Sequence, residues 1–544
     1  MSSSPDCPFT REQIAEWSSF GTKFKGKPTT PDEIEAANRR KEGTTAMKKR
    51  LVAELGDGWS EKKIEKELDR LALEVAQGVQ LAQGRPAYLD ACAGTRDFYP
   101  MEMKLRNWLF GHFRQTAILF GFEEYDCPVL EHVELYERKA GEEITDQMYN
   151  FEDKESTRVT LRPEMTPSLA RMVLNKTNLQ TGQVRLELPL KWFSVPQCWR
   201  FETTQRGRKR EHYQWNMDVV GVEHVNAEIE LLAAACHFFK NVGLSSSDVG
   251  IKVNSRAILE AILIRRMDKS IFPAACVIID KLDKIGPDAV IEQLAEISVD
   301  ESSSREILKA LQACTIDELA HQLDVGGESS EGANNPAVKD VKRLFELAKD
   351  YGFDDYLVFD ASVVRGLAYY TGIVWEAFDR KGELRAIMGG GRYDRLLELY
   401  GGEKCQIPCV GFGFGDCVIM ELLKEKKLLP EYKGTGVDYV VCAFDSTLYG
   451  AAANIAAKLR GCGWSVDLMP TPKKKVANSF KHADINGAKR MVFVAPDEIE
   501  KGVVRIKDLR IKSEATGEGV QVDVPLNEID RVDELIEQAA AASS

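Results

Sequence analysis

Six short strand-like runs, with few strand–helix–strand units between them, restrict the folds that this chain can adopt. They occupy residues 158–161, 190–201, 212–222, 356–359, 373–378 and 409–414. Parallel neighbours in a sheet need a crossover of a dozen or more residues, usually a helix, and few such units separate these runs. Their spacing and mixed polarity therefore predict an antiparallel sheet in an α+β fold.

The 544 residues divide into blocks of different texture, enough for about three to four domains. Residues 1–88 are polar and charged and include an amphipathic stretch, which predicts one or more appended helices. Residues 89–435 carry the strand-like runs, and the helical pattern of residues 245–350 predicts an insertion within them. Over residues 436–544 strands alternate with helices, which predicts a separate α/β domain.

Composition excludes several classes of protein. The twelve cysteines include no C-x-x-C pair, so we expect neither zinc nor a disulfide framework. No run of about 18 uncharged apolar residues is present, so we expect no membrane-spanning helix. The first segment, with Asp6, Glu12 and Glu16, makes a poor transit peptide, and the expected compartment is the cytoplasm. A net charge of −13 argues against sequence-blind nucleic-acid binding but leaves room for a specific RNA partner.

The first chemical cluster is the junction at residues 160–167, where a predicted strand ends and Pro167 lies near the start of a helix. Such a junction presents Glu164 and Thr166 at a sheet edge. A carboxylate beside a hydroxyl suits an ammonium group. From these residues alone, helix capping by Thr166 is an equally favoured alternative.

The second cluster is a predicted hairpin whose strands carry Arg200, Gln214 and Asp218, joined by the basic loop 203–210. Even separations within a strand keep side chains on one side, so these side chains can share a face. A rigid guanidinium suits bidentate contact with phosphate. The loop cations more often form only a solvated turn, and this is the favoured alternative for them.

Two further motifs contain glycine. Residues 364–372 include Arg365, Tyr369 and Tyr370, and residues 388–394 include three successive glycines. Glycine allows a backbone to approach a ligand closely, but a lone Gly-Gly-Gly is more often a turn or bulge. No Walker-type Gly-x-x-x-x-Gly-Lys-Ser/Thr is present, so any ATP chemistry must use another fold.

These motifs, in this order, resemble the histidyl-tRNA synthetases, a family of class II aminoacyl-tRNA synthetases. The resemblance covers roughly residues 90–540 and rests on segments 94–97, 161–166, 365–370 and 389–394, with Pro128 and the Arg200 hairpin. It implies a class II antiparallel catalytic domain with a helical insertion before Arg365. It also implies a C-terminal anticodon-binding domain and a homodimer with the Pro128 region near its interface.

The resemblance also implies a site for histidine. Its residues would be Glu164, Thr166, Gln214, Asp218, Tyr369 and Tyr370. Glu164, Thr166 and Gln214 would hold the ammonium and carboxylate groups. Asp218 and Tyr370 would contact the two imidazole nitrogens, which suits a neutral ring with one donor and one acceptor.

For ATP, the resemblance implies that the catalytic residues Arg200 and Arg365 flank the α-phosphate, with Glu202 and Arg392 as further nucleotide contacts. Two departures from the family pattern matter. Ala368 stands where the family often has aspartate. Cys417 and Val418 stand where motif 3 usually reads Glu-Arg, so the arginine that commonly clamps ATP is missing. We infer an altered nucleotide pocket in which Asp416 or a nearby basic residue such as Arg392 fills in.

The implied function is ATP-dependent attachment of histidine to tRNA(His), with Mg²⁺ on the nucleotide and no protein-bound metal. The alternative is a non-catalytic, synthetase-like regulatory subunit of ATP phosphoribosyltransferase, which would be expected to lack Arg365 and the C-terminal domain. A synthetase for threonine or proline is disfavoured by the double tyrosine that follows Arg365-Gly-Leu.

Three successive lysines in the C-terminal domain, Lys473, Lys474 and Lys475, are the candidate tRNA contacts, because this is where the family reads the anticodon. The alternative is that they are simply solvated. For the basic clusters of residues 39–41 and 48–50, a solvated helix face is favoured over contact with RNA.

Overall fold

The computed structural model describes residues 13, 16–17, 31–55, 60–76, 89–137, 145–264, 267–324, 331–364, 369–473, 475–512 and 519–542. Arg365, Ala368 and Lys474 lie outside the described residues. The chain divides into two compact units, residues 1–97 and 98–544.

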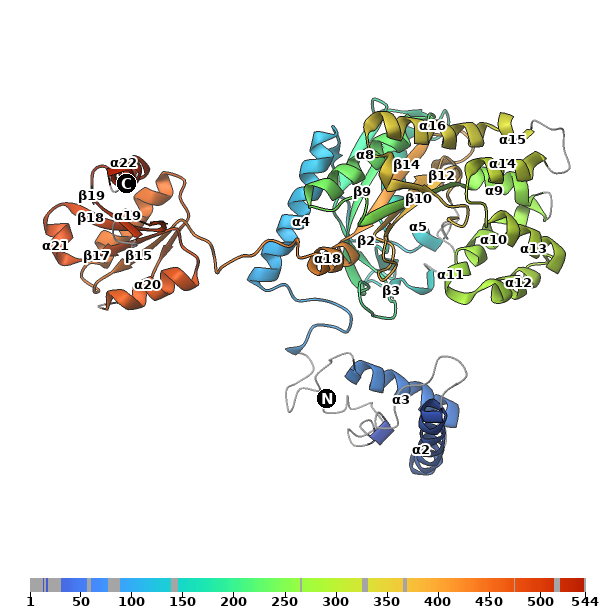
Figure 1. The fold of residues 1–544 in the computed structure, drawn as a ribbon, viewed down its shortest axis with the longest axis horizontal. Helices are drawn as coiled ribbons and strands as arrows, with labels where there is room; N and C mark the ends of the chain where they lie inside the picture. Colours follow the sequence, from blue (N-terminus) through green and yellow to red (C-terminus); the bar gives the residue numbers. More distant parts are fainter. Residues whose placement is uncertain are drawn as a thin grey trace. The chain divides into compact units, whose positions relative to one another are not determined.

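The first unit contains a hairpin of two helices, α2 (Pro31–Leu55) and α3 (Glu61–Ala76) (Figure 1). Its buried apolar residues are Trp17, Met47, Leu51, Ile64 and Leu68. Ion pairs join Arg40 to Asp69 at 3.0 Å and Lys48 to Glu65 at 2.8 Å. The amphipathic stretch is a helix as predicted, and part of each basic cluster is paired within the hairpin.

A nine-stranded sheet forms the core of the second unit (Figure 1). Across the sheet the order is β1 (Glu123–Glu124), β7 (Leu190–Ser194), β9 (Glu211–Val220), β14 (Cys409–Gly415), β13 (Met388–Arg392), β12 (Ile373–Asp379), β10 (Val249–Ser255) and β11 (Leu357–Phe359), and β8 (Gln197–Trp199) pairs with β9. Neighbours are antiparallel except at the two edges, where β1 with β7 and β10 with β11 are parallel. The predicted antiparallel sheet is confirmed in its centre.

Two smaller sheets flank the predicted junction at residues 160–167. The run predicted at residues 158–161 is β4 (Arg158–Leu161), which lies between β2 (Leu130–His132) and β3 (Tyr149–Glu152) instead of joining the central sheet. The remaining pair is β5 (Thr177–Asn178) with β6 (Gln183–Val184). Helices α5 (Glu134–Glu137) and α7 (Thr166–Asn175) accompany them.

Aromatic side chains hold helices against the back of the central sheet. The helices α4 (Pro100–Leu119) and α8 (Asn226–Asn241) pack on each other and against this side. The Phe113 ring stacks on Trp215 of β9 with centroids 4.8 Å apart, and Phe238 of α8 meets Phe414 of β14 at 5.1 Å. This buried layer fixes the strands from behind and leaves the other face of the sheet for chemistry.

The helical insertion begins later than predicted, because residues 249–255 form a strand, β10. Six of its seven residues are buried, so β10 lacks the alternation that marks a half-exposed strand. The helices of the insertion are α9 (Arg256–Leu263), α10 (Phe272–Ile279), α11 (Leu282–Ile285), α12 (Pro287–Glu296), α13 (Glu301–Ala310), α14 (Ile316–Asp324), α15 (Glu331–Asn334) and α16 (Pro336–Tyr351). Helices α17 (Leu396–Gly401) and α18 (Asp416–Glu425) follow β13 and β14.

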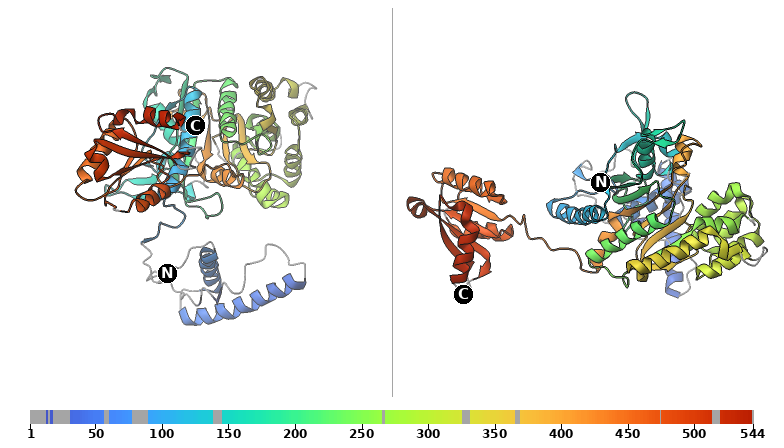
Figure 2. Two further views of the ribbon diagram at one scale, coloured as in Figure 1. Left: turned by 60° about the vertical axis from the view of Figure 1, so that its left-hand side comes forward. Right: turned by 90° about the horizontal axis from the view of Figure 1, so that it is seen from above.

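The C-terminal domain has its own five-stranded sheet, with helices on both sides of it (Figure 2). The strand order is β16 (Val466–Leu468), β15 (Tyr439–Ala443), β17 (Arg490–Val494), β18 (Val503–Lys512) and β19 (Gly519–Pro525). Its helices are α19 (Tyr449–Gly461), α20 (Val476–Ile485), α21 (Pro496–Glu500) and α22 (Val532–Ala542). The two pairs that include β15 are parallel, as an α/β domain requires. Within the described residues, no helix is long and apolar enough to cross a bilayer.

Candidate functional site

Glycines line one face of the central sheet, the face turned away from α8. Directly opposed residues in an antiparallel pair lie on the same side of the sheet. Asp218 of β9 is opposite Gly411, and Gln214 is opposite Gly415. The glycines on this side are Gly389 and Gly391 of β13 and Gly411, Gly413 and Gly415 of β14. We call this surface the glycine face.

The glycine face leaves the space that two predicted site residues occupy. A Cβ atom added at Gly411 would lie 1.8 Å from Asp218 Oδ1, and one at Gly413 would lie 2.2 Å from Gln214 Nε2. Both distances are too short for any side chain, so only glycine admits these two groups. The alternation Gly-x-Gly-x-Gly over residues 411–415 is the sequence signal for this surface. The glycines at 389–391 form a strand and not the turn or bulge of the alternative prediction.

Asp218 lies at one end of the site as a buried carboxylate, with 4% of its surface exposed. The Tyr393 hydroxyl donates a hydrogen bond to its Oδ1 at 2.5 Å. Burial raises the pKa of Asp218 to about 7, and the hydrogen bond from Tyr393 opposes that rise. Sequence reasoning gave Tyr393 no role, although it stands within the motif at residues 388–394.

Glu164 forms the other end of the site. Its Oε2 accepts a hydrogen bond from the Tyr369 hydroxyl at 3.4 Å and lies 3.8 Å from an Arg200 guanidinium nitrogen. Arg200 is also fixed by its Nε, which donates to the Pro163 carbonyl at 2.9 Å. Thr166 is the first residue of α7, and no side chain among the described residues caps that helix, so the capping alternative has no support. The structure thus brings Glu164, Tyr369 and Arg200 together.

Three tyrosines join the two carboxylates. The rings of Tyr369 and Tyr370 lie 5.0 Å apart, and Tyr369 meets the edge of Tyr393 at 5.9 Å. Tyr370 also lies over the glycine face, because a Cβ atom at Gly391 would come within 3.0 Å of its ring. A small polar molecule between Glu164 and Asp218 would therefore meet a carboxyl group at each end and aromatic rings between them.

The basic hairpin loop does not extend freely into solvent. Arg206 pairs with Glu421 at 3.0 Å and with Glu425, both on α18. Glu202, a predicted ATP contact, pairs with Arg208 at 2.7 Å. The structure thus favours a docked loop over the solvated turn of the alternative prediction.

Both groups suggested to replace the motif 3 arginine already have partners within the protein. Arg392 lies on the α8 side of the sheet, where its guanidinium bonds both oxygens of Glu228 at 2.6 and 2.7 Å. Burial lowers the pKa of Arg392, but the hydrogen bonds and charge of Glu228 outweigh that effect and raise it above its ordinary value. Asp416 accepts a hydrogen bond from the backbone N–H of Tyr213 at 2.9 Å. The position of Arg392 counts against the predicted ATP contact, because its guanidinium is committed to Glu228.

In the C-terminal domain, the lysine segment follows β16 at the edge where the parallel strands end. The backbone N–H of Lys473 donates to the Ala443 carbonyl at the end of β15, at 3.1 Å. Lys475 is exposed and directly precedes α20. The two described lysines therefore lie beside a helix N-terminus, where anions are favoured.

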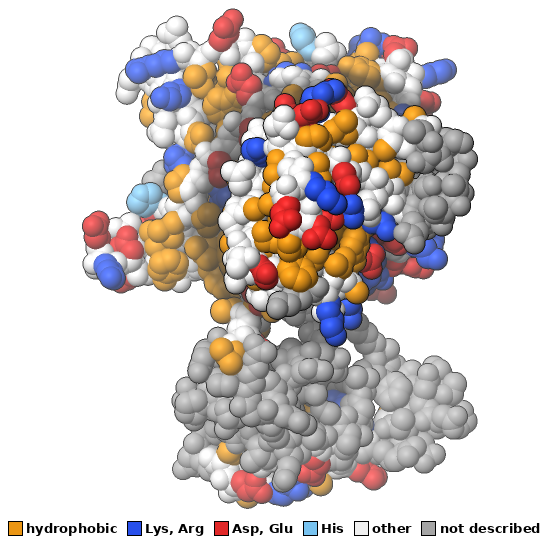
Figure 3. Space-filling model, turned by 90° about the vertical axis from the view of Figure 1, so that its left-hand side faces the viewer, with side chains coloured by type: hydrophobic (Ala, Val, Ile, Leu, Met, Phe, Trp, Pro, Cys, Tyr) orange, Lys and Arg blue, Asp and Glu red, His pale blue; other side chains and the backbone are white. Residues whose placement is uncertain are grey.

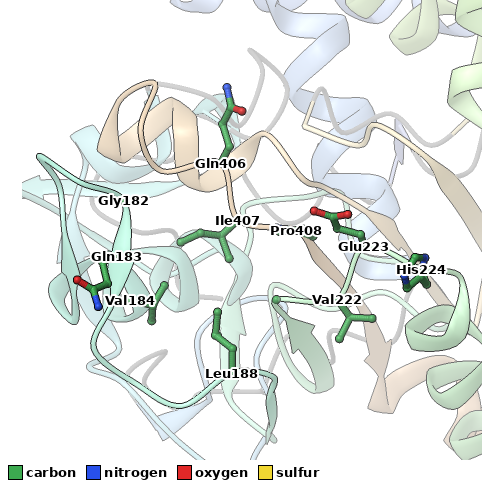
Figure 4. A pocket seen from close by; sticks show the side chains of 11 residues that line it. Gly182, Gln183, Val184, Leu188, Val222, Glu223, His224, Gln406, Ile407 and Pro408 are labelled. Atoms are coloured by element: carbon green, nitrogen blue, oxygen red, sulfur yellow. The ribbon is translucent and has the colours of Figure 1, made fainter.

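A hollow of about 600 Å³ lies at the ends of β7, β9 and β14 (Figure 4). Leu188, Val222 and Ile407 give it an apolar lining, with Glu223 and His224 at one side. Among the described residues, none of those predicted for catalysis or binding lines it. We therefore assign the chemistry to the glycine face and not to this hollow.

The raised pKa of Asp218 predicts how stability depends on pH. An unfolded aspartate has a pKa near 3.9, so between about pH 4 and 7 the folded chain binds the extra proton. Folding stability should fall as pH rises through this window, by up to about 1.4 kcal/mol per pH unit. Asp218→Asn removes this loss and keeps the oxygen that Tyr393 bonds. In thermal unfolding without histidine, the melting temperature of Asp218→Asn should rise relative to that of the wild type between pH 5 and pH 8.

A companion variant tests the cause. Tyr393→Phe removes the donor that holds the pKa of Asp218 down, so the loss of stability should extend to higher pH. A difference between Asp218→Asn and wild type that stays constant across pH 5–8 would contradict the assignment.

Comparison with known proteins identifies the family. The chain matches the family model described as Histidyl-tRNA synthetase over residues 94–415 and the model described as Anticodon binding domain over residues 438–532. The histidine--tRNA ligase, chloroplastic/mitochondrial, of Arabidopsis thaliana is 50% identical over 430 residues, which are 79% of this chain and 84% of that protein. The histidine--tRNA ligase of Opitutus terrae is 38% identical over 449 residues, 81% of this chain and 97% of that protein.

Solved structures agree on the fold. The histidyl-tRNA synthetase of Nostoc sp. PCC 7120 superposes with a TM-score of 0.63 at 23% identity, over 82% of this chain and 99% of that chain. A protein from Bacillus halodurans described as an ATP phosphoribosyltransferase regulatory subunit/histidyl-tRNA synthetase superposes with a TM-score of 0.59 at 20% identity. The superposition covers 75% of this chain and 99% of that chain. These likenesses show the class II fold alone. One family model matches more than half of this chain, and one relative is 50% identical to it. The chain therefore belongs to the histidyl-tRNA synthetase family.

Proposed function

We propose that this chain attaches histidine to tRNA(His) in two steps, with a histidyl-adenylate between them. The observation that carries the proposal is the pair of buried carboxylates, Glu164 and Asp218, at the two ends of a tyrosine-walled glycine face. The relatives from Arabidopsis and Opitutus, which are named as ligases for histidine, support it.

In this proposal the two carboxylates bind the two ends of the histidine molecule. Glu164, with Thr166 and Gln214, binds the ammonium and carboxylate groups. Asp218 and Tyr370 bind the imidazole nitrogens. A ring lacking those nitrogens would leave buried polar groups unpaired, and such a mismatch supports discrimination of about 10⁴ or more.

In the first step, an oxygen of the histidine carboxylate forms a bond to the α-phosphorus of ATP. The bond from that phosphorus to the bridging oxygen breaks, and pyrophosphate leaves. Arg200, held by the Pro163 carbonyl, and Arg365 neutralise the charge that grows on the α-phosphate. Mg²⁺ enters with ATP on its phosphates, since this ion prefers phosphate oxygens and water. In the second step, a hydroxyl of the 3′-terminal ribose of tRNA attacks the adenylate carbonyl, and AMP leaves.

The regulatory-subunit alternative is less supported. Such a subunit would be expected to lack the C-terminal domain, whereas residues 438–532 match the anticodon-binding model. The Bacillus halodurans relative resembles this chain at 20% identity, which carries no conclusion about activity.

Two further parts of the proposal concern assembly and location. A homodimer is supported by exposed apolar side chains at and near the three-stranded sheet that begins just after Pro128, because Val129, Leu130 and Phe151 are 38%, 44% and 48% exposed. A cytoplasmic location is the second part, and it stays a prediction. The name of the Arabidopsis relative places that protein in chloroplasts and mitochondria instead.

The proposed activity predicts histidine-dependent exchange of pyrophosphate into ATP, with none of the other nineteen amino acids active. Arg365→Ala should slow adenylate formation by about 10²–10³-fold, as loss of one transition-state donor commonly does. Histidine affinity should change little, because the arginine acts on the phosphate. Arg305→Ala, which alters an exposed cation on α13, is the control. Exchange with another amino acid, or an Arg365→Ala rate within twofold of wild type, would contradict the proposal.

The glycine face predicts a second result. Gly411→Ala should displace the Asp218 carboxylate from Tyr393, and the Michaelis constant for histidine should rise at least about tenfold, as loss of a hydrogen bond to a charged group implies. Gly415→Ala is the matched control on the same face of the same strand. A Cβ atom at Gly415 meets nothing within 4 Å, and its φ of −79° suits any residue. Equal effects of the two substitutions would remove Gly411 from the site.

A third prediction concerns tRNA. On the face drawn in Figure 3, cations and anions are interspersed, which agrees with contacts at local points only. Changing Lys473 and Lys475 to alanine should lower the slope of log affinity against log salt by about one unit for each phosphate that is no longer neutralised. Lys501→Ala, in the same domain, should leave the slope unchanged. Identical slopes for the double variant and wild type would assign the two lysines to solvent.

A further inference from the structure

Asn254, the second-last residue of β10, is a buried amide that the proposed chemistry does not use. Its side chain is fully buried. Nδ2 donates to the carbonyls of Ala361 at 2.8 Å and Val363 at 3.0 Å. Both amide hydrogens are thus used to hold one turn that lies more than 100 residues further along the chain.

The same turn is held by a second interaction from β10. Lys252 pairs with Asp360 at 2.8 Å, and Asp360 in turn accepts hydrogen bonds from the Ser362 backbone N–H at 2.9 Å and the Ser362 hydroxyl at 2.5 Å. Lys252 and Asn254 are two residues apart on one strand, so they lie on the same side. The turn at residues 360–363 is therefore fixed to β10 at both of its ends.

Asn254 is aligned with the histidine site across the sheet. Strand pairing places Asn254 opposite Val374, Val374 opposite Gly391, Gly391 opposite Gly411, and Gly411 opposite Asp218. Four strand spacings separate Asn254 from Asp218, or about 19 Å at about 4.8 Å each. Asn254 thus lies too far away to touch an imidazole ring held at Asp218.

Val363 supplies the connection between the turn and the site. Its side chain belongs to the same buried cluster as Tyr369, Tyr370 and Val374. Protein interiors are close-packed, so a shift of the Val363 backbone displaces the side chains packed in its cluster. Two of these, Tyr369 and Tyr370, line the path between Glu164 and Asp218.

Stability alone does not account for an asparagine at this position. Its Oδ1 is buried, and no described group donates a hydrogen bond to it. A buried acceptor left unpaired offsets much of the gain from the two hydrogen bonds that Nδ2 makes. The amide is then better explained by the geometry that it imposes than by the free energy that it adds.

We propose that Asn254 is a positioning residue for histidine recognition, which holds the 360–363 turn and, through Val363, sets Tyr369 and Tyr370 over the glycine face. This inference rests on the proposed function, because the tyrosines are assigned there to the histidine site. Asn254 acts through other residues and touches no reacting atom.

The test compares Asn254→Ala with Tyr356→Phe in the full chain. The Tyr356 hydroxyl is also buried and donates to a backbone carbonyl, that of Leu244 at 3.0 Å, but its ring belongs to the core on the α8 side. We expect Asn254→Ala to raise the Michaelis constant for histidine about ten- to thirtyfold, because the carbonyls of Ala361 and Val363 lose their donor and the turn shifts together with the packed tyrosines. The Michaelis constant for ATP should stay within twofold of wild type. Tyr356→Phe should leave both constants unchanged.

Val363→Ala gives an independent reading if Asn254→Ala fails to fold. This substitution keeps the hydrogen bonds of the Asn254 amide and removes only packing. It should also raise the Michaelis constant for histidine, by a smaller factor than Asn254→Ala does. Unchanged histidine constants in whichever of the two variants folds would overturn the proposal. So would a parallel rise for histidine and ATP. Failure of the wild type to exchange pyrophosphate with histidine would instead overturn the proposed function.

Discussion

The site in the catalytic domain depends on one carboxylate, Asp218, that is buried at the central sheet, where its loss of hydration is unfavourable. Removing Asp218 from water disfavours its ionised form, so the surroundings must supply a donor and space. Tyr393 supplies the donor at 2.5 Å, and Gly411 supplies the space by having no side chain. The aromatic layer behind the sheet packs on β9 and β14, the two strands on which Asp218 and Gly411 face each other. Apolar packing on one side of the sheet thus makes a polar site possible on the other.

Period-two spacing within the strands predicts which neighbouring side chains share a face, whereas their roles in histidine binding are implied by the family resemblance. Gln214 and Asp218 share a face of β9 because even separations always do. Glu164 and Arg200 stand at a strand end and in a hairpin, both marked by proline and charge patterns. Helix α3 and the alternation of strands and helices in the C-terminal domain followed from periodicity in the same way.

The parts that sequence did not reveal are contacts between distant residues. Tyr393 and Asp218 are separated by 175 residues, and Arg392 and Glu228 by 164, so no local pattern pairs them. Arg392 and Tyr393 are neighbours, yet alternation sends one side chain to the α8 side and the other to the site. The sequence did not predict strand β10, because burial on both faces removes the alternation that identifies a strand.

The departure from the family pattern at Val418 has a structural counterpart in the hairpin loop. A Cβ atom at Gly207 would lie 3.2 Å from Val418 Cγ2, so the loop backbone packs directly on this side chain. Residues 418, 421 and 425 share one face of α18, and Arg206 bonds both glutamates on that face. An arginine at 418 would place a long charged side chain where the loop now docks. Valine at 418 thus lets the hairpin loop pack on the helical face where Glu421 and Glu425 hold Arg206.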